Sequence, residues 1–182
     1  MGYAGSLAYS FLPELLEKLA STFPELKLEL VEPTDSSYEE LLFNYTTDLI
    51  FSRDAPENTL LEYKCLYSEN VSLVVPENHP LNEQNFNGLE DVKEDKFILS
   101  GLHHTTFYAS LQQIFKEHGF EPNIYIESDF GAMILSLVAR GLGISILPNA
   151  FHSGPFPGVR FLELPHKVKL YVIWWKGDSS PV

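Results

Sequence analysis

Several kinds of residue and motif are scarce in this chain of 182 residues. It holds one cysteine, so no disulfide can form within it. Lys and Arg number 12 against 25 Asp and Glu, and the net charge of −13 repels phosphate backbones and anionic lipid surfaces. No apolar run approaches the roughly 20 residues of a membrane-spanning helix, and no charged-then-apolar leader opens the chain. These absences predict a cytoplasmic protein that by itself binds neither nucleic acid nor membrane.

The motifs of common enzyme chemistry are also missing. There is no Gly-x-Ser-x-Gly, no phosphate-binding Gly-x-x-x-x-Gly-Lys and no dinucleotide fingerprint after a predicted strand. Gly141 and Gly143 stand at the end of a predicted helix rather than at its start, so they cannot cradle a pyrophosphate. We therefore expect no catalytic residue and no cofactor. A small α/β enzyme is an alternative, but it needs a nucleophile–base pair that the sequence does not offer.

Two histidines and the single cysteine invite chemical interpretations. His103 and His104 suggest metal ligands, but adjacent side chains in a loop do not converge easily on one ion, and no Cys, Asp or Glu stands at ligand spacing. We expect them to be solvated, or one of them to donate a hydrogen bond to a ligand. Cys65 lies in an alternating segment and is predicted to be a buried, small apolar side chain, with a redox-sensing thiol as the alternative. No metal site is predicted.

The segment Ser128–Pro148 is the most informative part of what the chain does contain. Hydrophobic residues make up 45% of the chain and charged residues 20%, as in a folded globular protein. In this segment a largely apolar helix ends at Gly141, and a buried strand follows that Pro148 closes. A helix that leads directly into a buried strand is half of a parallel α/β unit.

Similar units are predicted along the rest of the chain. Apolar residues at helical spacing predict helices at about Ser6–Thr22, at Tyr38–Leu42 and from Phe107 to Gly119. Strands are predicted at Leu26–Leu30, Asp48–Phe51, Leu60–Tyr67, Val71–Val75, Phe97–Leu99, Asn123–Glu127, Val159–Leu164 and Lys169–Trp175. Because strand–helix–strand units occur in both halves of the chain, the sequence predicts two α/β lobes.

Short motifs along the whole chain carry a family resemblance. They are, in order, Gly2, Ser6, Leu12-Pro13 and Phe23-Pro24, then Asp48-Leu49-Ile50, then Val74-Val75-Pro76 followed by His79-Pro80-Leu81, and finally Leu137 to Gly143 with Leu147-Pro148. With these motifs in the family's order and at its spacings, the chain resembles the effector-binding domain of LysR-type transcriptional regulators.

The resemblance implies an α/β fold of two Rossmann-like lobes joined by two hinge strands, as in type 2 periplasmic-binding proteins. Residues 1–73 with 161–182 would form lobe I, and residues 74–160 would form lobe II. The family's N-terminal winged helix-turn-helix domain is absent from this sequence. Because Gly2–Ser6 resembles the end of a first strand, we interpret the chain as a piece of a longer protein. A periplasmic-type solute-binding protein for a small anion is the alternative function.

The resemblance also implies partners. A small organic anion would bind between the lobes as the effector, and its binding would change a DNA-bound oligomer and transcription rather than drive a reaction. DNA would be contacted only through the absent domain. The chain would form a homodimer, and the full-length protein a tetramer. In the dimer, Leu7–Thr22 and Leu26–Val31 of one subunit would lie against Phe107–His118 and Asn123–Glu127 of the other.

Residues at the ends of predicted strands are candidates for effector contacts. Ser6 and the N–H group of Leu7 stand at a predicted helix N-terminus, which favours an anion, although Ser6 could also be a plain helix cap. Thr34 has the same character in the loop after the second predicted strand. Arg53 could pair with a ligand carboxylate or with one of two aspartates, Asp48 and Asp54. In lobe II the candidates are Ser100, Thr105, Thr106, Phe107, Phe130 and Gly131.

Overall fold

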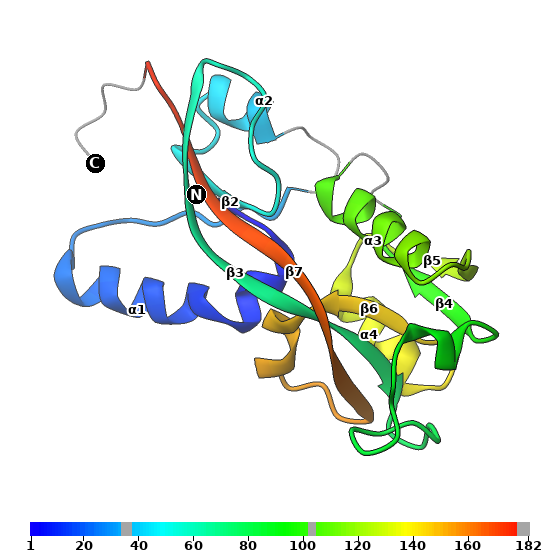
Figure 1. The fold of residues 1–182 in the computed structure, drawn as a ribbon. Coiled ribbons are helices and arrows are strands. Elements are labelled where there is room, and N and C mark those ends of the chain that lie inside the picture. Colours follow the sequence, from blue (N-terminus) through cyan, green and yellow to red (C-terminus); the bar gives the residue numbers. More distant parts are fainter. Residues whose placement is uncertain (34–37, 102–104, 178–182) are drawn as a thin grey trace. The chain divides into compact units, whose positions relative to one another are not determined.

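The computed structural model describes residues 1–33, 38–101 and 105–177, and the chain divides into two compact units (Figure 1). Unit 1 comprises Met1–Ser68 and Lys169–Val182, and unit 2 comprises Glu69–Val168. Two long strands, β3 (Leu61–Pro76) and β7 (Val159–Trp175), each run from one unit into the other. The lobe boundaries expected from the sequence, at residues 73/74 and 160/161, fall inside these two strands.

Unit 1 is built on the strands β1 (Gly2–Tyr3) and β2 (Leu49–Ser52). β1 pairs with β2 in parallel, and β2 pairs with the last part of β7 in antiparallel orientation. The helices of this unit are η1 (Gly5–Tyr9), α1 (Phe11–Thr22) and α2 (Tyr38–Phe43). Its buried apolar side chains form two clusters, one of Leu7, Leu12, Phe51 and Leu170 and one of Leu42, Ile50, Leu61 and Ile173.

The first predicted helix is interrupted in the structure. A 3₁₀ helix, η1, is followed at Ser10 by a break with φ −132° and ψ −111°, and α1 begins only at Phe11. The prediction of one continuous helix from Ser6 is therefore wrong. The break explains the position of Pro13, which lies in the first turn of α1, where a backbone N–H has no partner within the helix.

The strand predicted at Leu26–Leu30 is not present. Val31 forms a single bridge, in parallel with Gly2, in which the N–H of Tyr3 donates to the Val31 carbonyl at 3.0 Å, and the amino group of Met1 donates to the Glu29 carbonyl at 2.9 Å. The side chains of Leu26, Leu28 and Leu30 are exposed. Since no ladder forms along this segment, its alternating leucines extend toward solvent instead of covering a core.

Unit 2 combines a parallel strand pair with helices and a second strand pair. β4 (Lys96–Leu99) pairs in parallel with β5 (Asn123–Glu127), and β6 (Ser145–Pro148) pairs in antiparallel orientation with the unit 2 part of β3. The helices are η2 (Leu89–Val92), α3 (Thr106–Glu117), α4 (Gly131–Ala139) and η3 (Asn149–Ser153). The core includes Phe97, whose ring lies edge-on to that of Phe115 with centroids 5.1 Å apart.

Glycines end the helices of unit 2 where the sequence predicts. Gly119 and Gly141, just beyond α3 and α4, both have a φ of 73°, a left-handed conformation that disfavours other residues. Gly143 serves a different purpose, because a Cβ there would lie 2.6 Å from the backbone oxygen of Lys96. The absence of a side chain lets the Ile144 N–H donate to that same oxygen at 2.8 Å.

Cys65 is exposed, so the prediction of a buried thiol is wrong. It lies in the first half of β3, which belongs to unit 1 and leaves most of its side chains in solvent, whereas Val71–Val75 in unit 2 are buried. Within the described residues, no helix has both the length and the apolar character needed to cross a membrane.

Candidate functional site

Unit 1 brings together two of the predicted binding residues, Ser6 and Arg53. Ser6 follows β1 and Arg53 follows β2, and because these strands are parallel neighbours, their carboxyl ends lie at the same edge of the sheet. The Arg53 Nη2 donates a hydrogen bond to the Ser6 Oγ at 3.1 Å, although 47 residues separate the two. Ser6 is only 7% exposed. A guanidinium group and a hydroxyl therefore stand side by side at this edge.

The structure changes the reason for expecting an anion beside Ser6. Ser6 lies inside η1 rather than capping it, since the N-cap is Ala4 and no side chain caps the helix. The N–H of Leu7, expected to be free, donates to the Ala4 carbonyl at 2.9 Å, and the Leu7 side chain is fully buried in the core. A positive helix terminus is therefore not what would attract an anion here. The guanidinium of Arg53 is the cationic group.

Acidic and phenolic groups also lie close to this edge. A Cβ on Gly5 would overlap the carboxylate of Glu32, so that carboxylate packs directly against the residue before Ser6. Burial, and then the neighbouring Glu32, raise the pKa of Tyr3 above its ordinary value. The phenol of Tyr3 therefore remains neutral, and the fixed charges near Ser6 include one carboxylate as well as Arg53.

Unit 2 places its predicted binding residues after the carboxyl ends of β4 and β5, which are also parallel neighbours. Ser100 follows β4 directly. Thr105 is the N-cap of α3, and its Oγ1 accepts a hydrogen bond from the Tyr108 N–H at 3.2 Å. Phe107 is partly buried and packs against the core. Thr106 begins α3, but its side chain lies outside the described part, as do Thr34, His103 and His104.

Phe130 and Gly131 open α4, which begins shortly after the carboxyl end of β5. Phe130 is 52% exposed, so much of its ring is accessible. Gly131 has a packing role instead, since a Cβ there would overlap the ring of Phe151. The carboxylate of Asp129 lies against Gly101, 2.9 Å from where a Cβ would stand. This edge of unit 2 thus offers aromatic and hydroxyl groups together with a negative charge.

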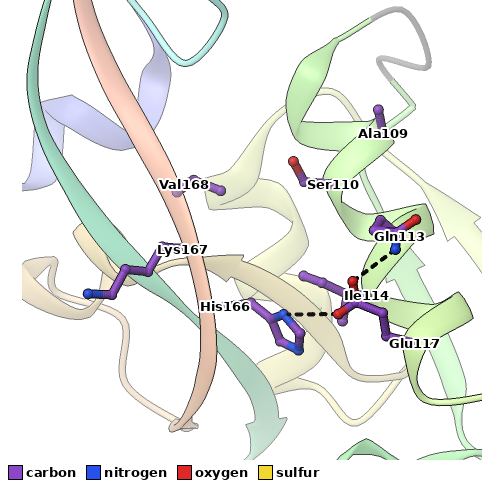
Figure 2. Close-up of a pocket in the computed structure, with 8 residues that line it drawn as sticks. All are labelled: Ala109, Ser110, Gln113, Ile114, Glu117, His166, Lys167 and Val168. Atoms are coloured by element: carbon purple, nitrogen blue, oxygen red, sulfur yellow. Dashed lines mark hydrogen bonds and ion pairs between the residues drawn. The ribbon is translucent and has the colours of Figure 1, made fainter.

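A separate pocket lies along α3 and β7 and uses none of the predicted binding residues (Figure 2). Its volume is about 390 Å³, and its lining comes from one face of α3 and from His166, Lys167 and Val168 of β7. The Gln113 Nε2 donates to the Glu117 Oε1 at 2.8 Å along its wall. No sequence pattern pointed to this surface, because its two sides lie about 50 positions apart in the chain.

A family model decides the identity of the chain. The model of the LysR substrate binding domain matches residues 1–182, the whole sequence. The chain belongs to this family. The expected resemblance and the expected fold class are therefore confirmed.

Curated relatives of this LysR substrate-binding domain are transcriptional regulators. The regulator AlsR of Bacillus subtilis is 28% identical over 82% of the chain, and BenM of Acinetobacter baylyi is 30% identical over 84% of it. The domain spans about half the length of these relatives, 50% and 51%. This family membership favours a regulatory domain over the alternative of a solute-binding protein.

Solved structures show the same fold. The effector binding domain of BenM, determined with its effector benzoate, is 26% identical and superposes with a TM-score of 0.84, covering 99% of this chain and 84% of that one. The regulatory domain of CcmR from Synechocystis, in complex with 2-PG, is 21% identical with a TM-score of 0.84 over 100% of this chain and 88% of that one. At that identity the CcmR likeness speaks for the fold alone.

Proposed function

We propose that this LysR substrate-binding domain senses a small organic carboxylate and that binding sets the transcriptional output of the regulator to which it belongs. The observation that carries the proposal is the pairing of Arg53 with Ser6 at the carboxyl ends of two parallel strands. Arginine suits carboxylates because its planar donors match both carboxylate oxygens. The solved BenM domain, whose effector is benzoate, offers a precedent of this chemistry in the family.

In this proposal the carboxylate of the effector binds to Arg53 and Ser6. The candidate contacts in unit 2, which follow from the family resemblance, are the hydroxyls of Ser100, Thr105 and Thr106 and the rings of Phe107 and Phe130. The carboxylate of Asp129, which lies against Gly101, disfavours a second anionic group at this edge of unit 2, so we expect a monocarboxylate with an apolar or aromatic body. Thr34 is retained as a predicted contact, whereas Leu7 and Gly131 support the site through packing.

A thermal-shift screen of small monocarboxylates, with benzoate among them, tests the proposal. At a concentration of about 100 times the Kd, a ligand stabilises the fold by roughly 2.7 kcal/mol. For a chain of this size, that corresponds to a rise in Tm of about 5–10 °C. A sensor returns its ligand unchanged, so chromatography of the incubated ligand separates it from an enzyme. Consumption of the ligand would contradict the proposal, as would a complete screen without hits.

The proposed homodimer would use apolar side chains that each unit leaves exposed. In unit 1 these are Phe23, Leu26, Leu28 and Leu30, and in unit 2 they are Ile124 and Tyr125 of β5. Within the described residues β5 pairs with β4 alone, so one of its edges is open. In the proposed dimer, the unit 1 set of each copy contacts the unit 2 set of the other copy. The two contacts are related by a two-fold axis, so the dimer is closed. In the whole regulator we propose a tetramer that contacts DNA through a separate domain.

Replacing Leu28 and Leu30 together by glutamate is expected to convert the dimer to a monomer. The change puts two like charges into each copy of an apolar contact, where their desolvation is costly. Sedimentation at micromolar concentration measures the result. Leu66→Glu is the matched control, since Leu66 is also an exposed leucine of unit 1 but lies on β3. A wild-type chain that sediments only as a monomer would contradict the proposed dimer.

A further inference from the structure

The first half of β3 is an open edge of a sheet that neither the proposed effector site nor the proposed dimer uses. The strand order in unit 1 is β1-β2-β7-β3, so β3 is the last strand there (Figure 1). On its other side β3 pairs with β6, and this pairing covers only Val71–Val74 in unit 2. Within the described part of the chain, residues 61–66 therefore have a neighbouring strand on one side alone.

The side chains of this edge are uncovered on both faces of the strand. Successive side chains of a strand point to opposite faces, yet all five from Glu62 to Leu66 are exposed. None of the five belongs to the two apolar clusters of unit 1, each of which includes residues of β2 and β7. Unit 1 thus leaves both a backbone edge and its side chains available to a further strand.

The backbone groups of Tyr63 face the open side of this edge. The Lys176 N–H donates to the Leu60 carbonyl at 3.0 Å, so the Leu60 carbonyl faces the β7 side. Backbone groups alternate in direction along a strand, so those of Leu61 and Tyr63 face the other way. The Leu61 N–H donates to the Asn58 carbonyl of the preceding turn at 3.1 Å. Tyr63 is therefore positioned to exchange two hydrogen bonds with an added strand.

The order of the side chains suits a second copy of the same edge. In an antiparallel pair centred on Tyr63, the two Tyr63 residues lie opposite each other, and Glu62 of each copy lies opposite Lys64 of the other. Leu60 and Leu66, which are 57% and 39% exposed, then form an apolar pair at each end. Aromatic, apolar and opposite-charge pairs all stabilise neighbouring strands.

The two charges also specify the register. Moving the centre by one residue in either direction places Glu62 or Lys64 opposite its own copy, where like charges repel. A lysine on an open edge usually prevents pairing with other strands. Here the glutamate of a second copy compensates for it, so the edge favours its own copy over an uncharged strand.

We propose that two copies of this chain pair through β3, antiparallel and centred on Tyr63, so that their sheets become continuous. The contact is short, and interfaces of small area are weak. The pair therefore forms at near-millimolar concentration and separates at micromolar concentration. It is distinct from the proposed dimer, which uses Leu26–Leu30 and β5, and it does not depend on the effector site. In a regulator that holds several copies together, the high local concentration favours it.

Disulfide trapping tests the pairing. Tyr63→Cys is combined with Cys65→Ser, so that position 63 holds the single cysteine of the chain. Opposed residues of a hydrogen-bonded antiparallel pair have Cα atoms about 5.5 Å apart, within the range that a disulfide spans. Mild oxidation at near-millimolar protein concentration is expected to give a covalent dimer on a non-reducing gel. Leu66→Cys with Cys65→Ser is the matched control, because the register places its two cysteines about 20 Å apart.

A charge swap tests the register. In the Tyr63→Cys/Cys65→Ser background, Lys64→Glu places like charges opposite each other twice and should lower the crosslinked fraction several-fold. Adding Glu62→Lys returns opposite charges in reversed order and should restore the crosslink. Both positions are exposed, so the Tm of each variant should stay close to that of the background, which melting curves check.

Three results would overturn the proposal. Equal crosslinking at positions 63 and 66 would mean that the cysteines meet by random collision. A Tyr63→Cys crosslink that Lys64→Glu leaves unchanged, or that the charge swap does not restore, would show that Glu62 and Lys64 do not face each other. No crosslink at position 63 would leave the edge to solvent or to a strand of a different protein.

Discussion

Arg53→Gln is expected to remove nearly all of the thermal shift that a carboxylate ligand gives. A hydrogen bond to a charged group contributes about 1.5–3 kcal/mol, so its loss weakens binding by about 10–150-fold. At the ligand concentration that saturates the wild type, a 100-fold weaker Kd leaves a stabilisation of about 0.4 kcal/mol in place of about 2.7. The rise in Tm then falls from about 5–10 °C to about 1 °C, measured against each variant's own Tm without ligand.

Two further variants sharpen this prediction. Arg140→Gln makes the same change of charge at an exposed residue that follows α4, and it should keep the full shift. Ser6→Ala removes a neutral hydroxyl and should give an intermediate loss, because a neutral hydrogen bond contributes only about 0.5–1.5 kcal/mol. A full shift in both Arg53→Gln and Ser6→Ala would place the carboxylate elsewhere.

The helices α3 and α4 of unit 2 were predictable because their signals are local. The helical stripe from Phe107 and the apolar run after Phe130 each end at a glycine, and the structure has both glycines at a φ of 73°. A left-handed cap depends on one residue and its immediate neighbours, so a single sequence specifies it. The interruption of the first helix at Ser10 has no comparable signal.

Strand predictions failed where they depended on distant partners. The alternating leucines at 26–30 fit a strand, but a strand forms only where another strand pairs with it, and here the backbone contacts reach no further than Val31 and the Glu29 carbonyl. The opposite error occurred at residues 68–70, where polar side chains suggested a gap although β3 continues through them. Ladder hydrogen bonds join backbone groups, so polar side chains do not end a strand.

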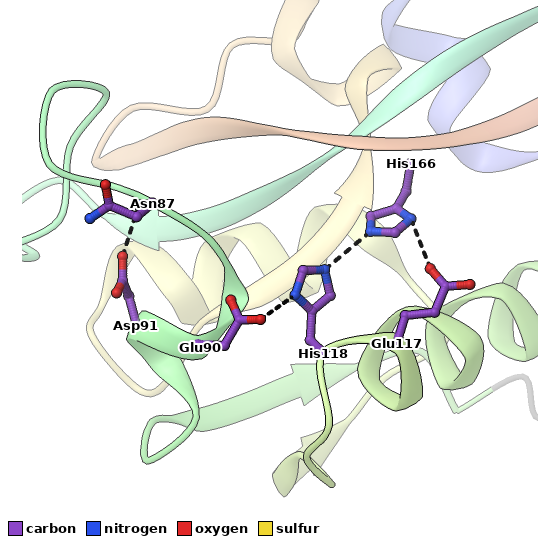
Figure 3. Close-up of polar contacts among 6 residues, drawn as sticks. All are labelled: Asn87, Glu90, Asp91, Glu117, His118 and His166. Atoms are coloured by element: carbon purple, nitrogen blue, oxygen red, sulfur yellow. Dashed lines mark hydrogen bonds and ion pairs between the residues drawn. The ribbon is translucent and has the colours of Figure 1, made fainter.

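The candidate site shows the same division between local and distant information. Ser6 and Arg53 were each predicted from a strand end, but their contact depends on the parallel pairing of β1 with β2. His103 and His104 raised the question of a metal site because they are adjacent in the sequence, although no metal site was predicted there. His118 and His166 have their Nε2 atoms 3.3 Å apart (Figure 3) although 48 residues separate them, and no pattern in the sequence marks them as partners.

Phe97→Ala is expected to give the largest loss of stability among the changes considered. Phe97 is fully buried in the core of unit 2, with its ring edge-on to Phe115 and near Phe120. Removing a buried phenylalanine ring costs about 3–5 kcal/mol, which includes the cavity that it leaves. The Tm should fall by about 6–20 °C, as followed by calorimetry or circular dichroism.

Phe130→Ala, the same change at a half-exposed ring, should alter the free energy of unfolding by no more than about 0.5 kcal/mol while weakening the binding of an aromatic carboxylate. If the two variants melt at the same temperature, the packing assigned to Phe97 is wrong.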